Sequence, residues 1–236
     1  MYNYLVYTPI HNTLIFLYTN TLDLGVSIIL LTLIVKVILL PLNIKAQISA
    51  KHTQDKMKVL KPKIDEINNK HKDDKITASL ALRDLYKEHN FNPASSLLSV
   101  FTLFIQIPIL FALYKVLSTD TINMNPIAFG LFDASHKLVW MGILVGISMF
   151  VMAKVTMAKA VPVDLVEKKN KTKEEDLQLA MSKMMKTQFI YVMPIIIAFT
   201  STLLPAALGI YFIVSNLFAI VQYYIIEKIK NRVIVK

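Results

Sequence analysis

The chain alternates between long uncharged apolar stretches and segments crowded with charged residues. Apart from Lys36, uncharged residues run continuously over four stretches: 24–44, 92–114, 138–153 and 187–226. A helix of about 20 apolar residues is long enough to cross the hydrocarbon core of a bilayer. The last stretch holds 40 residues, so we expect it to cross twice, with a turn at 201–205. The pattern predicts an all-α membrane protein with five transmembrane helices.

The five predicted spans divide the rest of the chain into loops and tails. The spans themselves are expected at 24–44, 92–114, 138–153, 187–203 and 205–226. Residues 1–23 are apolar and rich in tyrosine, and Pro9 interrupts them. We expect this segment to be an extracytoplasmic interfacial helix with its rings at headgroup level; the alternative is a disordered tail.

Residues 45–91 are charged and carry the helical period. Met57, Leu60, Ile64 and Ile67 recur at spacings that place them on one face of a predicted helix. A second helix is indicated by Leu80, Leu82, Leu85 and Tyr86. Residues 71–74 supply the turn, which predicts a cytosolic helical hairpin. Two interpretations carry equal weight: a solvated loop held near anionic lipid headgroups, or a docking arm for cytosolic partners or incoming chains.

The remaining connections are an outer loop at 115–137, a cytosolic loop at 154–186 and a basic cytosolic tail at 227–236. In the cytosolic loop, one helical face carries Leu177, Met181, Met184 and Met185. Flexible methionine side chains suit a surface that meets varied apolar partners. The more ordinary interpretation is a helix that continues into the next span and packs there.

The distribution of basic residues predicts the orientation. The chain is 55% hydrophobic, yet its net charge is +10. Of its 26 Lys and Arg residues, 11 lie in 45–93, 8 in 154–186 and 4 in 227–236, all on one side of a five-span arrangement. Because cytoplasmic loops carry the excess of Lys and Arg, we expect the N-terminus outside and the C-terminus in the cytoplasm. The absence of cysteine excludes disulfides, thiol catalysis and zinc–thiolate sites.

Lys36 lies inside the first predicted span, where a cation is costly. The span holds 15 Leu, Ile or Val residues, which together favour insertion by about 7 kcal/mol, against a cost of about 3 kcal/mol for a central lysine. Lys36 is about 13 Å along the axis from Lys45, farther than its side chain reaches by snorkelling. Since no predicted span contains Asp or Glu, a hydrated groove open to the cytosol is the simplest environment that keeps it charged.

Polar residues on three spans predict the wall of that groove. They recur at helical spacing on each span: Thr32, Lys36 and Asn43 on the first, Ser99, Thr102 and Gln106 on the second, and Tyr211, Ser215 and Gln222 on the fifth. The alternative is ordinary hydrogen bonding between membrane helices. That alternative accounts for the serines but not for the cation.

The sequence contains no catalytic or nucleotide-binding motif, and its five histidines are scattered outside the spans. We therefore expect no enzymatic activity, no metal and no cofactor. A rival to the binding groove is a small anion channel or transporter that uses Lys36 as its selectivity charge. A third option gives Lys36 a purely architectural role.

Four segments resemble the YidC–Oxa–Alb membrane protein insertases, in the short bacterial form. They are PLNIKAQISAKHTQDKMKVLKPKIDEI at 41–67, LRDLYKEHNFNP at 82–93, LFIQIPILFALYKVL at 103–117 and LPAALGIYFIVSNLFAIVQ at 204–222. The resemblance extends in order from about residue 20 to residue 226. It implies a five-span core with a cytosolic hairpin and a hydrophilic groove that is closed on the outside. Lys36 occupies the place where this family usually carries an arginine.

The resemblance also implies a function: a membrane protein insertase and chaperone in a bacterial cell membrane. Its expected partners are nascent membrane proteins, the Sec translocon, the ribosome and membrane lipids, with no specific nucleic acid. On this hypothesis a client's short polar tail enters the groove and is held by Lys36, Gln106, Ser215 and Gln222. The apolar segment of the client then passes into lipid beside the third and fifth spans.

Overall fold

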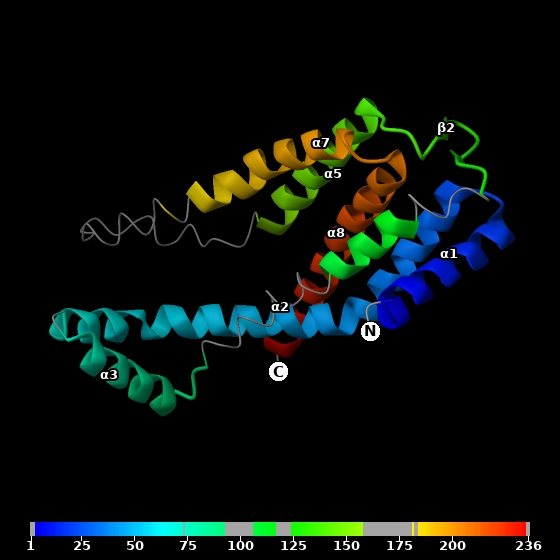
Figure 1. Ribbon diagram of the computed structural model, residues 1–236. Coiled ribbons are helices and arrows are strands. Elements are labelled where there is room, and N and C mark those ends of the chain that lie inside the picture. The colour runs from blue at the N-terminus through cyan, green and yellow to red at the C-terminus, as the bar shows by residue number, and fades with distance from the viewer. Residues whose placement is uncertain are drawn as a thin grey trace. The chain divides into compact units, whose positions relative to one another are not determined.

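The computed structural model describes residues 3–72, 74–92, 106–116, 124–157, 181 and 184–234, and these are mostly helical (Figure 1). The chain divides into two compact units, Met1–Ile38 with Pro108–Lys236, and Leu39–Ile107. The helices and strands are, in order, η1 (Asn3–Tyr7), α1 (Thr8–Thr21), α2 (Leu24–Lys70), α3 (Lys75–Glu88), an unlabelled helix Gln106–Val116, β1 (Ile127–Ala128), β2 (Phe132–Asp133), α5 (Val139–Met157), η5 (Gln188–Val192), α7 (Met193–Thr202) and α8 (Ala206–Ile234).

Four helices in the described part of the chain are long and apolar enough to cross a membrane. They are Leu24–Met57, Val139–Met157, Met184–Thr202 and Ala206–Ile229. The second predicted span, 92–114, overlaps the shorter apolar helix Gln106–Val116, and its residues 93–105 lie outside the described residues. The chain is thus an all-helical, multi-pass membrane protein with four candidate spans among the described residues.

Helix α2 does not stop at the predicted end of the first span, residue 44. It continues without a break to Lys70 and contains both Pro41 and Pro62. Each proline removes one backbone N–H donor from the helix. Long apolar helices accommodate such a loss because neighbouring groups and small local adjustments satisfy the freed carbonyl. The span and the first helix of the charged segment therefore form a single element.

The N-terminal segment is also more continuous than its sequence predicts. Pro9, expected to interrupt it, lies in the first turn of α1, and the preceding residue Tyr7 is itself helical. Proline is tolerated there because the first N–H groups of a helix have no intrahelical partner. Helix α1 ends at Thr21, and Leu22 adopts a left-handed conformation (φ 56°). Its residues Ile10 and Leu14 are buried.

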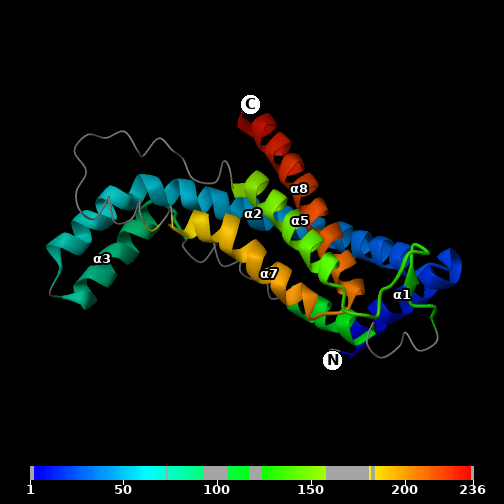
Figure 2. The same cartoon turned by 90° about the horizontal axis from the view of Figure 1, so that it is seen from above.

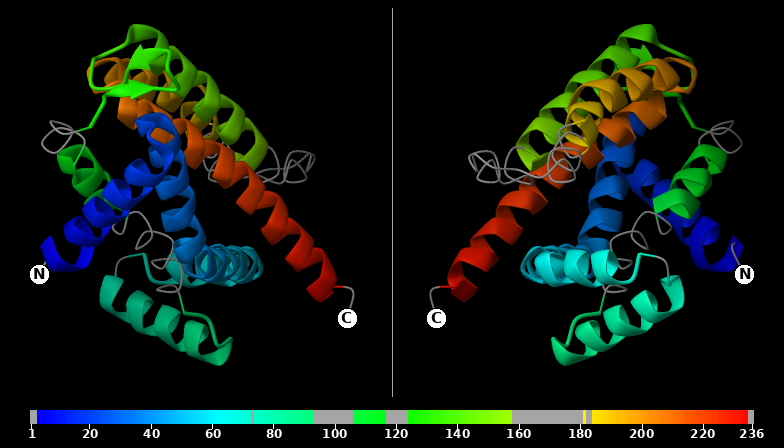
Figure 3. Two further views of the ribbon diagram at one scale, coloured as in Figure 1. Left: turned by 90° about the vertical axis from the view of Figure 1, so that its right-hand side faces the viewer. Right: turned by 90° about the vertical axis from the view of Figure 1, so that its left-hand side faces the viewer.

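In the first unit, α5 packs against both α7 and α8 (Figures 1 and 3). Leu203–Pro205 form the turn between α7 and α8, within the predicted turn at 201–205. One hydrophobic core joins α1, α2, the helix Gln106–Val116 and α8 through Leu14, Ile28, Leu113 and Leu208, all almost fully buried. Helix α8 extends to Ile234, through most of the predicted tail.

In the second unit, α3 packs against the later part of α2, as Figure 2 shows. Buried Leu60, Leu85 and Phe91 form the centre of this contact, with Met57, Ile64, Ile67 and Tyr86 around it. Leu80, one of the residues that indicate the second helix, is 54% exposed. Ala78 takes part in the buried face, and at α3's N-terminus the Asp74 side chain accepts hydrogen bonds from Ile76 and Thr77.

Candidate functional site

Lys36 lies at the edge between a buried and an exposed face of α2. Its neighbours Val37 and Ile38 are 56% and 68% exposed, whereas Thr32, one turn earlier, is only 1% exposed. The Lys36 ammonium lies 6.0 Å from the centroid of the Tyr211 ring on α8. An aromatic face attracts a cation by about 0.5–2 kcal/mol, most strongly where water is excluded. Packing therefore places an aromatic ring against the cation.

Tyr211 and Ser215 lie one turn apart on α8. Tyr211 is 2% exposed. The buried Ser215 Oγ has no hydrogen-bond partner among the described residues. A buried hydroxyl of this kind favours a nearby water or polar ligand. Lys36, Tyr211 and Ser215 together form what we call the cationic cluster.

The other predicted groove residues have different surroundings. The Thr32 hydroxyl donates to the backbone oxygen of Ile28 at 2.6 Å, so it serves its own helix. Gln222 is 6% exposed and lies about 16 Å along α8 from Tyr211. Asn43 and Gln106 belong to the second unit, and Asn43 Oδ1 is buried without a partner among the described residues. Ser99 and Thr102 lie outside the described residues.

The sequence reasoning missed a polar contact between two apolar helices. Asn216 on α8 donates from Nδ2 to the Ser148 Oγ on α5 at 2.9 Å. Ser148 in turn donates to the Val145 oxygen in its own helix at 2.8 Å. Single polar residues in neighbouring membrane helices commonly pair in this way. The isolated Asn216 in an apolar stretch was the available signal.

A pair of glycines on α5, also missed, allows α7 to approach closely. A Cβ atom at Gly142 would collide with Thr202 Cγ2, and one at Gly146 would lie 2.6 Å from Ala198 Cβ. Glycines four residues apart are a known contact surface between membrane helices. Their spacing in the sequence predicts this packing without identifying the partner helix.

Residues 124–138, which we call the hairpin cap, cover one end of the first unit. Ala128 and Ala134 are fully buried in its core. The ring of Phe129 lies so close to Gly25 that a Cβ atom there would be 2.6 Å from Phe129 Cζ. The backbone N–H groups of Ala206 and Ala207, in the first turn of α8, donate to the His136 and Ala134 oxygens at 2.9 Å each. The cap therefore accepts hydrogen bonds from two buried N–H groups of α8 that have no partner within their helix, and it packs against the start of α2.

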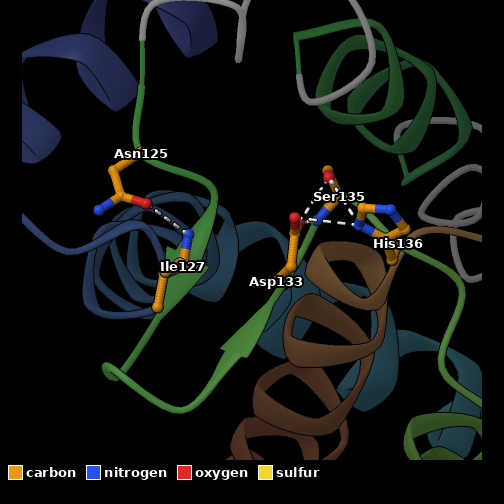
Figure 4. A network of polar contacts seen from close by, with 5 residues as sticks. All are labelled: Asn125, Ile127, Asp133, Ser135 and His136. Carbon is orange, nitrogen blue, oxygen red and sulfur yellow. Dashed lines mark hydrogen bonds and ion pairs between the residues drawn. The ribbon is translucent and has the colours of Figure 1, made fainter.

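A polar network stabilises the turn of the cap that carries these oxygens (Figure 4). Asp133 accepts hydrogen bonds from the backbone N–H and hydroxyl of Ser135, and His136 Nδ1 lies 3.0 Å from Asp133 Oδ2. The Ser135 hydroxyl lowers the pKa of the Asp133 carboxyl below its usual range; the Ser135 N–H and His136 act in the same direction. Nearby, Asn125 Oδ1 accepts from the Ile127 N–H at 3.1 Å.

The chemistry available in the cationic cluster is binding. A cation, a hydroxyl and an aromatic face can hold a polar or anionic group, but they do not make a nucleophile–base pair. In the described part of the chain, no group of three His, Asp or Glu side chains is placed to hold a metal. The geometry supports transient, non-covalent contact with a polar segment.

The amino-acid sequence of this chain is similar to those of known membrane proteins. Residues 16–232 match the family model described as 60Kd inner membrane protein. The "Membrane protein insertase YidC" of Fusobacterium nucleatum is 32% identical, over 94% of this chain and 97% of that protein. The proteins of the same name from Staphylococcus aureus (strain JH9) and Campylobacter jejuni are each 31% identical. They are matched over 91% and 94% of this chain, and over 71% and 37% of their own lengths.

The resemblance seen in the four sequence segments is thereby confirmed over nearly the whole chain. Members of this family are insertases and not enzymes, in agreement with the function expected from the sequence. The chain belongs to the YidC/Oxa/Alb family of membrane protein insertases.

Proposed function

We propose that this chain inserts membrane proteins by holding a client's polar tail beside Lys36 while the client's apolar segment enters lipid. Insertase activity on nascent membrane proteins follows from the family and from the relatives named above. The Lys36 ammonium over the buried Tyr211 ring is the observation that carries the groove part of the proposal. This contact fixes the position of the Lys36 ammonium, which lies partway along an apolar helix.

The driving force comes mainly from the client. Burying its apolar segment contributes about 25 cal/mol per Å² of apolar surface removed from water. With a potential positive outside, each negative charge that crosses outward gains about 2.3 kcal/mol per 100 mV. Lys36 lowers the barrier because a nearby cation partly replaces the hydration that an anionic tail loses.

The proposed membrane arrangement has five spans, with the N-terminus outside and the C-terminus in the cytoplasm. The excess of Lys and Arg in 45–93, 154–186 and 227–236 supports it. The contact between α3 and the later part of α2 supports a helical hairpin there. In this arrangement the hairpin cap lies outside, and the close contact of Phe129 with Gly25 supports a groove closed on that side.

The partners beyond client proteins also belong to the proposal. The C-terminal end of the chain carries four basic residues, Lys228, Lys230, Arg232 and Lys236. Their positive charge suits contact with the anionic surface of a ribosome. The exposed apolar side chains of α5, including Ile143 and Ile147, suit lipid, a passing client segment or a Sec translocon subunit.

A substitution series at Lys36 tests the groove. We expect Lys36→Arg to insert a short single-span test protein into proteoliposomes at close to the normal rate, because it keeps the charge. Lys36→Ala should be slower, and Lys36→Glu slower still for a client with an acidic tail. Lys45→Ala is the matched control, because it removes an exposed lysine of the same helix.

Equal insertion by all three folded variants would refute a mechanistic role for the charge. Failure of Lys36→Glu alone to fold would make Lys36 architectural. Anion conductance through the same vesicles, abolished by Lys36→Ala while insertion persists, would support the rival channel. Reversing the charge of the client's tail should reverse the order of Lys36→Ala and Lys36→Glu.

A further inference from the structure

A pocket of about 820 Å³, broadly open to solvent, lies along α3 and the residues that follow it, and its described lining belongs to the second unit. Its volume is in the range of pockets that take small ligands. The apolar part of its lining comes from Leu82, Tyr86 and Phe91. The cationic part comes from Arg83 and Lys87, and no acidic residue is among the described side chains that line it.

The apolar part of the pocket has a defined shape. After α3 the chain reverses at Asn90, whose φ of 45° lies in the left-handed region. The Phe91 N–H then donates to the Tyr86 oxygen at 2.8 Å. The two rings meet edge to face with centroids 5.2 Å apart, and Phe91 is only 5% exposed. This return of the chain fixes an aromatic wall next to the cationic residues.

Two lysines of α2 hold the end of α3 in this position. Lys56 Nζ donates to the Asn90 oxygen at 3.1 Å, and Lys63 Nζ lies 3.0 Å from His89 Nε2. Each contact joins residues far apart in the sequence, so the pocket depends on the packing of the two helices. Both ammonium groups also add positive charge beside the pocket.

Arg83 and Lys87 are one helical turn apart, so their side chains leave α3 from the same face. A guanidinium and an ammonium at this spacing suit one phosphate, which can accept two charge-assisted hydrogen bonds. The neighbouring apolar wall suits a short hydrocarbon segment attached to that phosphate. An anionic amphiphile fits both halves of the pocket.

The position of the pocket in the chain indicates where such a ligand comes from. The described lining of the pocket extends to Asn92, the first residue of the uncharged stretch 92–114. A charged helix that leads directly into an apolar stretch of this length lies next to the headgroups of the membrane. There, phospholipids are the abundant amphiphiles with a phosphate, and the positive charge of the pocket favours the anionic ones.

We propose that this pocket binds the headgroup of an anionic phospholipid, with the phosphate at Arg83 and Lys87. The glycerol and first methylene groups lie against Tyr86 and Phe91. The bound lipid holds the α2–α3 contact region at the membrane surface. This site is separate from the cationic cluster, so insertion and lipid binding can be measured independently.

Because the chain contains no cysteine, a single Ser79→Cys substitution can carry an environment-sensitive fluorophore at the pocket. The labelled full-length protein in a neutral detergent is titrated with short-chain phosphatidylglycerol, short-chain phosphatidylcholine and inorganic phosphate. We expect saturable binding of phosphatidylglycerol. Inorganic phosphate lacks the hydrocarbon part, and the cationic choline group of phosphatidylcholine offsets the charge of its phosphate and is repelled by Arg83 and Lys87. Each should therefore bind at least about ten-fold more weakly than phosphatidylglycerol.

The double variant Arg83→Gln with Lys87→Gln should weaken phosphatidylglycerol binding by about ten-fold or more. The matched control, Lys72→Gln with Lys75→Gln, removes the same charge from residues outside the pocket and should leave binding nearly unchanged. Arg83→Lys keeps the charge and should retain most of the affinity. Circular dichroism with unchanged helix content establishes that each variant is folded.

Equal binding of the two phospholipids, or a folded double variant with normal affinity, would overturn the proposal. Tighter binding of an acidic peptide than of phosphatidylglycerol would also overturn it, in favour of a protein partner. Normal insertion of the test protein by a variant that has lost lipid binding would leave the insertase proposal intact. Loss of insertion in Lys36 variants would likewise leave the lipid site intact.

Discussion

At the scale of single residues, the Lys36 ammonium and the Tyr211 ring form the contact that positions the proposed groove charge. The two residues come from helices far apart in the chain, α2 and α8. Tyr211 is buried, whereas Lys36 is only partly buried. The ring therefore holds the cation at a boundary where it can still meet a polar segment that enters from the surface.

Substitution of Tyr211 should separate the contributions of its ring and its hydroxyl. Tyr211→Phe keeps the aromatic face and should change insertion less than about two-fold, whereas Tyr211→Leu removes the attraction. Because a cation–π contact contributes about 1 kcal/mol, we expect about five-fold slower insertion for the leucine variant. Initial rates with the single-span test protein measure the effect. Similar rates for the two variants would show that the ring does not position Lys36.

At the scale of elements, the α5–α7 contact is built from small residues instead of large interlocking ones. Gly142 and Gly146 lie against the backbone and side chains of Thr202 and Ala198. Close approach increases dispersion contacts, which drive association of helices in lipid, where the hydrophobic effect is lost. The Asn216–Ser148 hydrogen bond adds a directional contact between α5 and α8.

Gly146→Val should destabilise the protein by about 1–3 kcal/mol, the usual cost of inserting volume into a packed contact. The melting temperature of the purified protein in detergent, followed by circular dichroism, measures the change. Ala198→Gly should restore part of the loss in the double variant, because the new side chain would collide with the Ala198 Cβ. Leu144→Val, at an exposed position on the same helix, is the control. An unaffected melting temperature for Gly146→Val would disprove this account of the packing.

At the scale of the whole molecule, the hairpin cap joins elements that are distant in sequence. It places Phe129 against Gly25 at the start of α2 and bonds to the first turn of α8. The backbone N–H of Asn125, in the cap, also donates to the Tyr18 hydroxyl of α1 at 2.7 Å. Loss of order in the cap would affect three helices at once.

Acid should weaken the cap through Asp133. Its folded pKa lies below the usual value because the Ser135 hydroxyl donates to the carboxylate, so the carboxylate stabilises the folded state above its unfolded pKa of about 3.9. That contribution is lost as pH falls through the lower folded pKa. We expect Asp133→Ala to lower the melting temperature at neutral pH, and the difference from the unsubstituted protein to shrink below about pH 4. A difference that stays constant down to pH 2.5 would contradict this role.

The candidate site could be predicted in part from the sequence. The position of Lys36 in an apolar stretch, with Tyr211 and Ser215 one turn apart, was visible as a pattern. The contact between Lys36 and Tyr211, the cap over Gly25 and the use of Thr32 within its own helix were not. Helix ends were less predictable than helix positions. Pro9, which suggested a break, lies in the first turn of α1, where its missing donor is tolerated. Helix α2 continues past the predicted end of the first span, residue 44, to Lys70.

The sequence by itself determined the family, the all-helical multi-pass class and the apolar helices. The apolar helices could be predicted because the free energy of transferring a segment into lipid is close to the sum of the contributions of its residues. The tertiary structure alone decided which side chain meets Lys36, which helix lies against Gly142 and Gly146, and how the cap covers the end of α8. These are contacts between residues distant in the chain, and they depend on shape and approach distance. Neither quantity is carried by the composition or period of any one segment.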